Sequence, residues 1–461
     1  MDNLEKKIKR FIFENENINL KKSIKKSFKE VATSSNMQID IVSILFFLGR
    51  WLPFSIAIGV ATGIIASIMD LFVVNINMFL SRNIIYFFIY PLIIAYIAGY
   101  VLKKYPQTGG PGIGYSILHL KRKSYVPISV ILYKLIISVL TLAGGFIAGR
   151  EGPSFFLGVA LGEWIGKIYG FGKKFKNLLG LIGGGAFTGA LLKAPLGSSI
   201  FAMELENMYD FDYRPFVPMI VASIVSYLTF SFFRGSHAFI HFSGKSLWDL
   251  NSIPYIIFMG IIVSIIIYIY TILFHSFQNL SKILPMNKRT VVGTILALPI
   301  LFAIYYMTNN QDIFSAPANM NILSNMTNIS FSIKDDIIII VGTMLITSFT
   351  LAFGMPGGLV LPVLIMGAAV GNIFGHIFPT QLITFTLAGM GAALAAAAKT
   401  PLAAIVMITE MSHDNVVIPM TAAVITSYIA SFGYSTYLGQ ENIFKGNLRT
   451  FSMNWKQNEK R

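Results

Sequence analysis

The sequence contains no cysteine and few charged residues. Without cysteine the chain has no disulfide framework and no thiolate metal site, and its six histidines show no spacing typical of metal ligands. Only 12% of the residues are charged, whereas a soluble globular domain averages about 25%. Because 54% of the residues are hydrophobic and the mean hydropathy is +0.66, the composition predicts an integral membrane protein that crosses the membrane several times.

Sequence signals of an enzyme or of a bound cofactor are also missing. The chain shows no carboxylate pair, metal cluster or nucleophile triad, so we expect neither catalysis nor a cofactor. The glycine-rich stretch from Pro106 to Gly114 has the spelling of a dinucleotide loop, but no βαβ unit surrounds it. Glycine and proline at membrane depth instead indicate the end or the break of a helix.

Long runs without charged residues are what the sequence does contain. A helix needs about 20 apolar residues to cross a bilayer, and the runs are continuous rather than alternating, so an all-α membrane protein is predicted. The first hydrophobic element is Ile41–Met69, which Asp70 is expected to end, and the longest charge-free run is Ile337–Ala398. The other charge-free runs are Asn83–Leu102, Pro215–Phe233, Leu250–Ser281, Thr290–Gln311 and Asn415–Gln440.

Positive charge is concentrated near the two ends of the chain, whose net charge is +15. Nucleic-acid binding is one interpretation. The positive-inside rule, with both tails in the cytoplasm beside anionic lipid, is favoured because the rest of the chain is apolar. We therefore expect basic cytoplasmic tails at residues 1–39 and 450–461, with no regulatory domain and no nucleic-acid partner. The N-terminus lacks the early apolar stretch of a cleavable signal peptide.

Two stretches of the membrane region repeat each other. Gly149, Pro153 and Gly158 have identical partners 209 positions later, whereas Glu151 is matched by Val360. A second block repeats at an offset of 206, where Lys193 and Glu204 meet Lys399 and Glu410. Paired lysines and glutamates are not explained by a bias toward glycine and alanine. The sequence therefore predicts a duplicated membrane unit, with a first repeat at residues 40–249 and a second at residues 250–449.

Several segments begin a helix after glycine or proline, and these helix starts predict the function. The free N–H groups and the positive dipole end at such a start bind anions, so we expect a small anion held mostly by backbone near the midplane. Glu151, in the stretch Gly149–Pro153, would compete with that anion when deprotonated and swing out when protonated. An intramembrane acid is functional by default; the alternative is an acid that only complements the helix dipole.

The remaining charged residues of the membrane region are expected to have structural roles or to be solvated. Glu204 and Glu410 lie at equivalent helix ends and are expected to be structural, by capping or by pairing with Lys193 and Lys399, with a proton relay as the alternative. Arg150 is expected to be a structural partner or a field-shaping charge. Asp70 is expected to be structural, and Glu206 solvated.

These motifs resemble those of the CLC family of chloride channels and proton-coupled anion transporters. The stretch Gly149–Pro153 is similar to the family signature, Gly357–Pro362 to its second filter motif, and Gly110–Gly114 to its first. The resemblance covers about residues 40–449. It implies a multi-helix fold with two inverted-topology repeats and broken helices, a homodimer with one anion path per subunit, and Glu151 as the gating glutamate. The anion-binding residues that it implies are Pro111, Gly112, Ile113, Gly149, Leu359, Val360 and Phe444.

The chain departs from the family pattern at Gly114, which replaces the final proline of the first motif, and at three further places. Pro111 replaces the usual serine of the first motif, and Phe444 is aligned with the usual anion-coordinating tyrosine. Both hydroxyl donors would then be missing. Each hydrogen bond to an ion contributes about 1.5–3 kcal/mol of binding free energy, so their loss weakens the preference for chloride. Family members with proline at the first position tend toward nitrate, which is therefore the alternative substrate.

The last of these departures is Leu205, which stands where proton-coupled relatives often carry an internal proton-accepting glutamate. Without that glutamate, a proton path to the inner side would have to use water, Glu204 or Glu206.

The sequence thus predicts transport of chloride or another small anion through the plasma membrane by a multi-pass protein embedded in the lipid bilayer. Our first hypothesis is a passive, voltage-gated-type chloride channel gated by Glu151, because Leu205 is apolar. The second is a proton/anion antiporter in which protons are a further substrate. A membrane enzyme or scaffold is the remote third.

Overall fold

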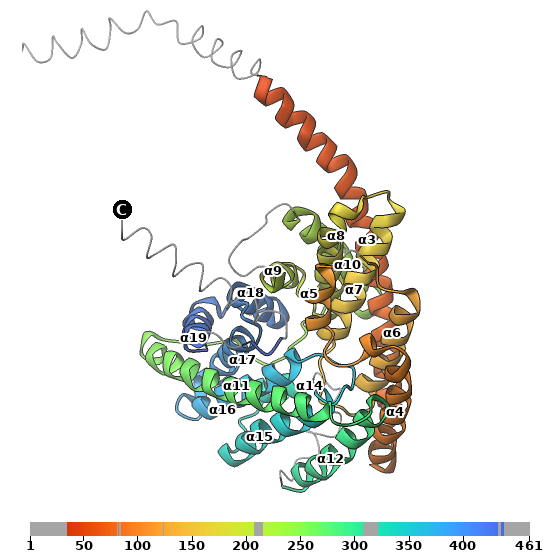
Figure 1. Ribbon diagram of the computed structural model, residues 1–461. Coiled ribbons are helices and arrows are strands. Elements are labelled where there is room, and N and C mark those ends of the chain that lie inside the picture. The colour runs from red at the N-terminus through yellow and green to blue at the C-terminus, as the bar shows by residue number, and fades with distance from the viewer. Residues whose placement is uncertain are drawn as a thin grey trace, which may run out of the picture. The chain divides into compact units, whose positions relative to one another are not determined.

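The computed structural model describes residues 35–80, 82, 84–122, 124–206, 215–307, 321–431 and 435–437. Within these residues the chain forms sixteen α-helices and no strand (Figure 1). The chain divides into two units after Phe54, and the sites described below all belong to the second unit. Six of the described helices are long and apolar enough to cross a membrane.

The helices of the first half of the chain include several short ones that end inside the apolar region. Their bounds are α3 Ser35–Leu80, α4 Ile84–Lys104, α5 Ile113–Leu120, α6 Ile128–Ala143, α7 Glu151–Ile168, α8 Lys176–Leu192, α9 Pro195–Glu206 and α10 Phe216–Arg234. The breaks before α5, α7 and α9 fall at glycine or proline, which disfavour a continuous helix. Short 3₁₀ turns at Pro106–Thr108 and Lys173–Phe175 connect some of these helices.

The second half has the same mixture of long and broken helices. Its helices are α11 Ile253–Ser281, α12 Met286–Met307, α14 Asn321–Asn328, α15 Ile333–Thr350, α16 Val360–Gly375, α17 Leu382–Ala398, α18 Pro401–Ser412 and α19 Val417–Ala430. The 3₁₀ turns lie at Leu250–Ser252 and Pro379–Gln381. The triplet α16, α17 and α18 corresponds to α7, α8 and α9, because each pair of helices carries the residues that repeat in the sequence.

Packing within the two triplets follows the same pattern. Helix α7 packs on α8 and α16 on α17, while α9 and α18 pack on each other, next to one another in Figure 1. A Cβ atom on Gly158 would meet the carbonyl of Gly183, and one on Gly367 would meet that of Gly389. Small residues let two membrane helices approach closely, so the repeated glycines are explained by helix packing rather than by chemistry.

The structure corrects several predicted helix bounds. Asp70 does not end the first hydrophobic helix, because α3 continues to Leu80. The reason is that Asp70 forms ion pairs with Arg150 and Arg234, so its charge is compensated inside the helix. The polar segment 311–332 has no lysine or arginine, a composition typical of a loop outside the cytoplasm, but it contains α14 among its described residues.

Two stretches that are mostly apolar in the sequence are each divided into shorter helices. The repeated block at residues 178–205 lies in α8 and α9, and the long charge-free run Ile337–Ala398 lies in α15, α16 and α17. Lys193 and Lys399 adopt the left-handed conformation, with φ of 54° and 58°, at the ends of α8 and α17. Proline follows each of them two positions later, so the helix restarts in a new direction as α9 or α18.

Candidate functional site

The first turns of α7 and α16 are joined by two hydrogen bonds between glycines. The N–H of Gly149 donates to the carbonyl of Gly358 over 2.8 Å, and the N–H of Gly358 donates to the carbonyl of Gly149 over 2.7 Å. This reciprocal pair is an isolated antiparallel bridge. It brings together two helix starts that lie 209 residues apart in the sequence, as expected for equivalent segments of a duplicated unit.

Glu151 connects the two helix starts through its side chain. It is the first residue of α7, only 1% exposed, and its Oε1 accepts hydrogen bonds from the amides of Val360 at 2.6 Å and Leu361 at 3.2 Å. Those amides are orphan donors at the start of α16, where the helix dipole favours negative charge. We call Gly149, Glu151, Gly358, Val360 and Leu361 the helix-start site. The carboxylate of Glu151 occupies the position in front of these two amides.

Glycines are required around this carboxylate because the backbones are in close contact. A Cβ atom on Gly358 would lie 2.6 Å from the Cδ of Glu151, and one on Gly152 would lie 2.8 Å from the Cα of Gly358. Gly112 has φ of +85°, and a Cβ atom there would lie 2.8 Å from the carbonyl oxygen of Gly152. The loop before α5 therefore also borders the helix-start site.

Among the residues predicted to bind an anion, those in the described chain come together here. Ile113 begins α5 and is fully buried, while Leu359 is the N-cap residue of α16. Pro111, Gly112 and Leu359 line a cavity of about 240 Å³, together with Tyr437. We call it the Tyr437 cavity. Phe444 lies outside the described residues, as does the tail predicted at residues 450–461. Of the tail predicted at residues 1–39, residues 1–34 lie outside the described residues, and the rest belongs to α3.

Two further residues beside the site were missed by sequence reasoning. Tyr437 is 2% exposed and lines the Tyr437 cavity. The sequence resemblance instead assigns Phe444 to the position of the family's anion-coordinating tyrosine. Lys134 of α6 is fully buried and donates from Nζ to the carbonyls of Thr108 at 2.9 Å and Gly110 at 3.0 Å. A lone lysine in an apolar helix was the available signal, since intramembrane charges are costly. Tyr437 had no comparable signal.

Glu204 and Glu410 form a reciprocal pair of caps. The Glu204 carboxylate accepts from the amides of Leu402 at 3.2 Å and Ala403 at 2.8 Å, at the start of α18. The Glu410 carboxylate accepts from Leu196 at 3.1 Å and Gly197 at 2.7 Å, at the start of α9. Each repeat therefore caps a helix of the other.

The expected pairing of these glutamates with lysines is contradicted by the side-chain contacts. Lys193 donates to the carbonyl of His237 at 2.8 Å, and Lys399 binds Ser431. Both lysines end a helix in a left-handed conformation, and the oxygen atoms of His237 and Ser431 are the acceptors of their ammonium groups. Leu205, next to Glu204, is buried, and Glu206 is the last residue of α9.

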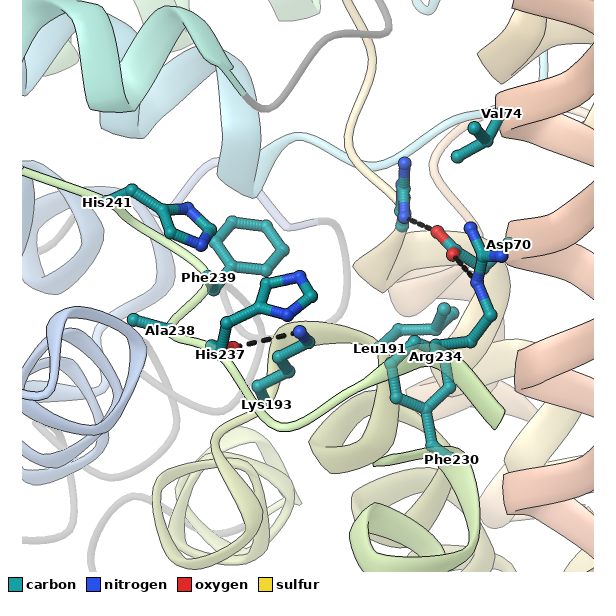
Figure 2. Close-up of a pocket in the computed structure, with 11 residues that line it drawn as sticks. Asp70, Val74, Leu191, Lys193, Phe230, Arg234, His237, Ala238, Phe239 and His241 are labelled. Carbon is teal, nitrogen blue, oxygen red and sulfur yellow. Dashed lines mark hydrogen bonds and ion pairs between the residues drawn. The ribbon is translucent and has the colours of Figure 1, made fainter. Parts of the chain in front are cut away.

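A second cavity, of about 320 Å³, lies beside Arg150 and is shown in Figure 2. Asp70 holds both Arg150 and Arg234, the latter over 2.6 Å from Nε to Oδ2. Lys193, His237 and His241 complete its ionisable lining. The Lys193 ammonium lowers the pKa of His237 in the loop after α10. One carboxylate against two guanidinium groups and one ammonium group leaves this Arg150 cavity positive, so it attracts anions next to Glu151.

Comparisons with known proteins identify the family that the chain resembles over most of its length. The family model described as voltage gated chloride channel matches residues 94–431. The chain is 26% identical over 392 residues to an uncharacterised protein of Methanocaldococcus jannaschii, covering 82% of this chain and 92% of that one. It is also 26% identical over 350 residues to the H(+)/Cl(-) exchange transporter ClcA of Yersinia pestis, covering 72% of each chain.

Solved structures share the fold. A slow cyanobacterial Cl-/H+ antiporter superposes with a TM-score of 0.72 at 21% identity, over 87% of this chain and 98% of that one. A CLC-type fluoride/proton antiporter gives a TM-score of 0.73 at 19% identity, over 85% and 97% of the two chains. The family match covers well over half of the sequence, and the helical architecture agrees with it. The chain is therefore a multi-pass membrane protein of the voltage-gated chloride channel (CLC) family of anion transport proteins.

Proposed function

We propose that this chain is a proton/anion antiporter in which Glu151 has two roles. Its carboxyl group binds the transported proton, and its deprotonated form occupies the position that the anion takes. The observation that carries the proposal is the carboxylate of Glu151 on the amides of Val360 and Leu361. The carboxylate stands in for an anion there. An anion and a deprotonated Glu151 therefore exclude each other, and protonation of Glu151 removes the charge that holds it on the amides.

This competition couples the two substrates. When Glu151 takes up a proton from one side of the membrane, it releases the amides, and an anion from the other side replaces it at the helix-start site. When the anion leaves to the side from which the proton came, the carboxyl releases its proton to the opposite side and returns to the amides. One ion thus moves in exchange for the other. The exchange reaction named for ClcA and for two of the similar solved structures supports this order of events.

A passive channel gated by Glu151 is the second candidate, and Leu205 is the observation that favours it. Leu205 is buried and apolar beside Glu204, so this position offers no carboxyl group for proton movement to the inner side. In a channel the same protonation would open the path without coupling. Both candidates use a small anion as substrate, with chloride first and nitrate as the alternative because Pro111 offers no hydroxyl group.

The cellular setting follows from charge and from the family. We propose the plasma membrane as location, with both termini in the cytoplasm, since lysine and arginine concentrate in the two tails. We also propose a homodimer with one anion path in each subunit, based on the family resemblance.

The deciding experiment uses the purified full-length chain in liposomes. A chloride or nitrate gradient is imposed across the vesicle membrane, and pH and anion concentration are recorded together. Exchange predicts that protons move uphill, driven by the anion gradient, and that the movement stops when the anion gradient is removed. Anion flux without proton movement would establish the channel instead, and the absence of anion flux would refute both candidates.

A further inference from the structure

Three ionisable side chains form a buried cluster away from the helix-start site. His119 comes from α5, Glu163 from α7 and Lys176 from α8, and all are at most 2% exposed. The Lys176 Nζ lies 2.7 Å from Glu163 Oε1, and the His119 Nε2 lies 3.1 Å from Glu163 Oε2. We call these residues the Glu163 cluster. Inside a membrane protein such groups are expensive and indicate function by default.

An aromatic side chain separates the Glu163 cluster from the Tyr437 cavity. The ring of Tyr115 stacks on that of His119, with ring centroids 5.7 Å apart, and also contacts Phe156 at 5.5 Å. Tyr115 itself lines the Tyr437 cavity, as do Pro111 and Leu359 of the neighbouring helix starts. A cavity of about 240 Å³ accommodates several water molecules. The cluster is therefore one side chain away from a cavity that is lined by Leu359, the residue directly before the helix-start amides of α16.

The other side of the cluster faces a basic surface. Lys121 and Arg122 follow α5, and Lys173 and Lys174 precede α8, and all four are exposed. Lysine and arginine are in excess on the cytoplasmic side of membrane proteins, so this end of α5 and α8 is the inner one. The opposite end of α8 carries Lys193 and the Arg150 cavity. The Glu163 cluster thus lies between the inner surface and the Tyr437 cavity.

We infer that the Glu163 cluster is the station at which protons from the inner side are taken up and released during exchange. This inference rests on the proposed antiport function. A proton from the inner water binds the cluster, where His119 and Glu163 share it, and water in the Tyr437 cavity carries it to Glu151. No bond other than those to the proton changes. The groups that face Glu163 are His119 and Lys176, and Tyr115 and Arg122 lie next to His119.

The cluster provides what the residues near Glu204 lack. Glu204 is held by two amides of α18, so its carboxylate already serves as a cap, and Leu205 has no ionisable group. Lys176 compensates the charge of Glu163, which keeps the pair neutral while His119 gains or loses a proton. A purely structural role would be to hold α5, α7 and α8 together, and the test must separate the two roles.

The test measures anion and proton movement by wild type, Glu163→Gln and the double variant Glu163→Gln/Lys176→Met in liposomes. The double variant removes both charges, so no unpaired ion is left buried if the single variant folds poorly. We expect both variants to lose at least tenfold in proton movement per anion while the anion still flows. Asp336→Asn, which removes another buried carboxylate on α15, is the matched control and should keep the wild-type ratio.

A readout that a structural role would not change is the dependence on pH at each side. Proton movement by His119→Asn should become insensitive to the inner pH and keep its dependence on the outer pH. Variants that carry anions with the wild-type proton ratio would overturn the inference and leave antiport intact. If the wild type carries anions without protons, both the antiport function and this inference are wrong. If Glu163→Gln lowers anion flux and proton flux in equal proportion, the cluster has a structural role only.

Discussion

The starts of α7 and α16 are equivalent by contact and share their flanking glycine and proline. They differ at the three positions between these residues, and one of the three carries an acid in the first repeat only. The two segments exchange hydrogen bonds between Gly149 and Gly358, and each begins a helix with the same glycine and proline spacing. In the first repeat the acid is Glu151, and its place in the second is taken by Val360. The acid of one repeat is bound by the amides of the other. The second repeat thus supplies the amides, and the first repeat supplies the acid that binds them.

The largest expected effect comes from removing this difference. Glu151→Gln keeps the shape of the side chain but cannot carry a negative charge or exchange a proton at neutral pH. We expect proton movement to stop and anion flux to become independent of pH, whereas in the wild type flux rises as pH falls and Glu151 becomes protonated. Paired pH and anion recordings in liposomes measure both. Val360→Ala, at the equivalent place of the second repeat, should retain the pH dependence.

A wild-type pH dependence in Glu151→Gln would remove this residue from the mechanism. Equal effects of Glu151→Gln and Val360→Ala on flux would show that the two positions do not differ in function. Side-chain packing at either helix start, rather than the charge of Glu151, would then control flux.

The glycines of α7 and α16 test where the two repeats are the same. Gly158→Ala and Gly367→Ala each place a methyl group against a carbonyl of the packed helix. Overpacking typically costs about 1–3 kcal/mol, so both should lower the thermal unfolding temperature in detergent by a similar amount. Gly172→Ala, with open space around its Cβ position and an ordinary φ of −68°, is the control. Destabilisation by only one of the two would show that the triplets are packed differently.

The repeats were the part of the fold that the sequence could predict. Identical residues survive at a constant offset because the same close contact occurs twice, as at Gly158 and Gly367, and a side chain there is excluded by backbone. Helix bounds were less predictable. Asp70 looked like a helix end because its partners, Arg150 and Arg234, come from elements 80 and 164 positions away.

The composition of the candidate site shows the same limit. Glu151 stood out because an acid in an apolar region is conspicuous in a single sequence. Tyr437 did not, because an aromatic residue in an aromatic-rich chain acquires its role only when tertiary structure places it in a cavity with Pro111 and Leu359. Lys134 could have been noticed as an isolated charge, but its partners are backbone carbonyls, which leave no pattern in the sequence.

A smaller effect is expected from restoring a hydroxyl group near the helix starts. Pro111→Ser offers a donor at the Tyr437 cavity, and a hydrogen bond to an ion contributes about 1.5–3 kcal/mol. Chloride gains more from one added donor than the larger, delocalised nitrate ion, so we expect the chloride-to-nitrate flux ratio to rise by up to about tenfold, which is about 1.4 kcal/mol. Pro111→Ala controls for loss of the proline ring. An unchanged ratio would contradict the assignment of Pro111 to the anion path.

The smallest effect concerns Glu204 and Glu410, the places where the repeats are most alike. Glu204→Gln and Glu410→Gln each keep one acceptor oxygen but remove the charge from a cap on a helix of the other repeat. A helix cap contributes about 0.5–2 kcal/mol, and here the change is partial, so each variant should lose about 1 kcal/mol or less of unfolding free energy. Because α9 and α18 pack on each other and each carries the cap of the other, the double variant should depart from the sum of the two losses. Proton movement per anion should be unchanged in both, and its selective loss in Glu204→Gln would transfer the proton path from the Glu163 cluster to α9.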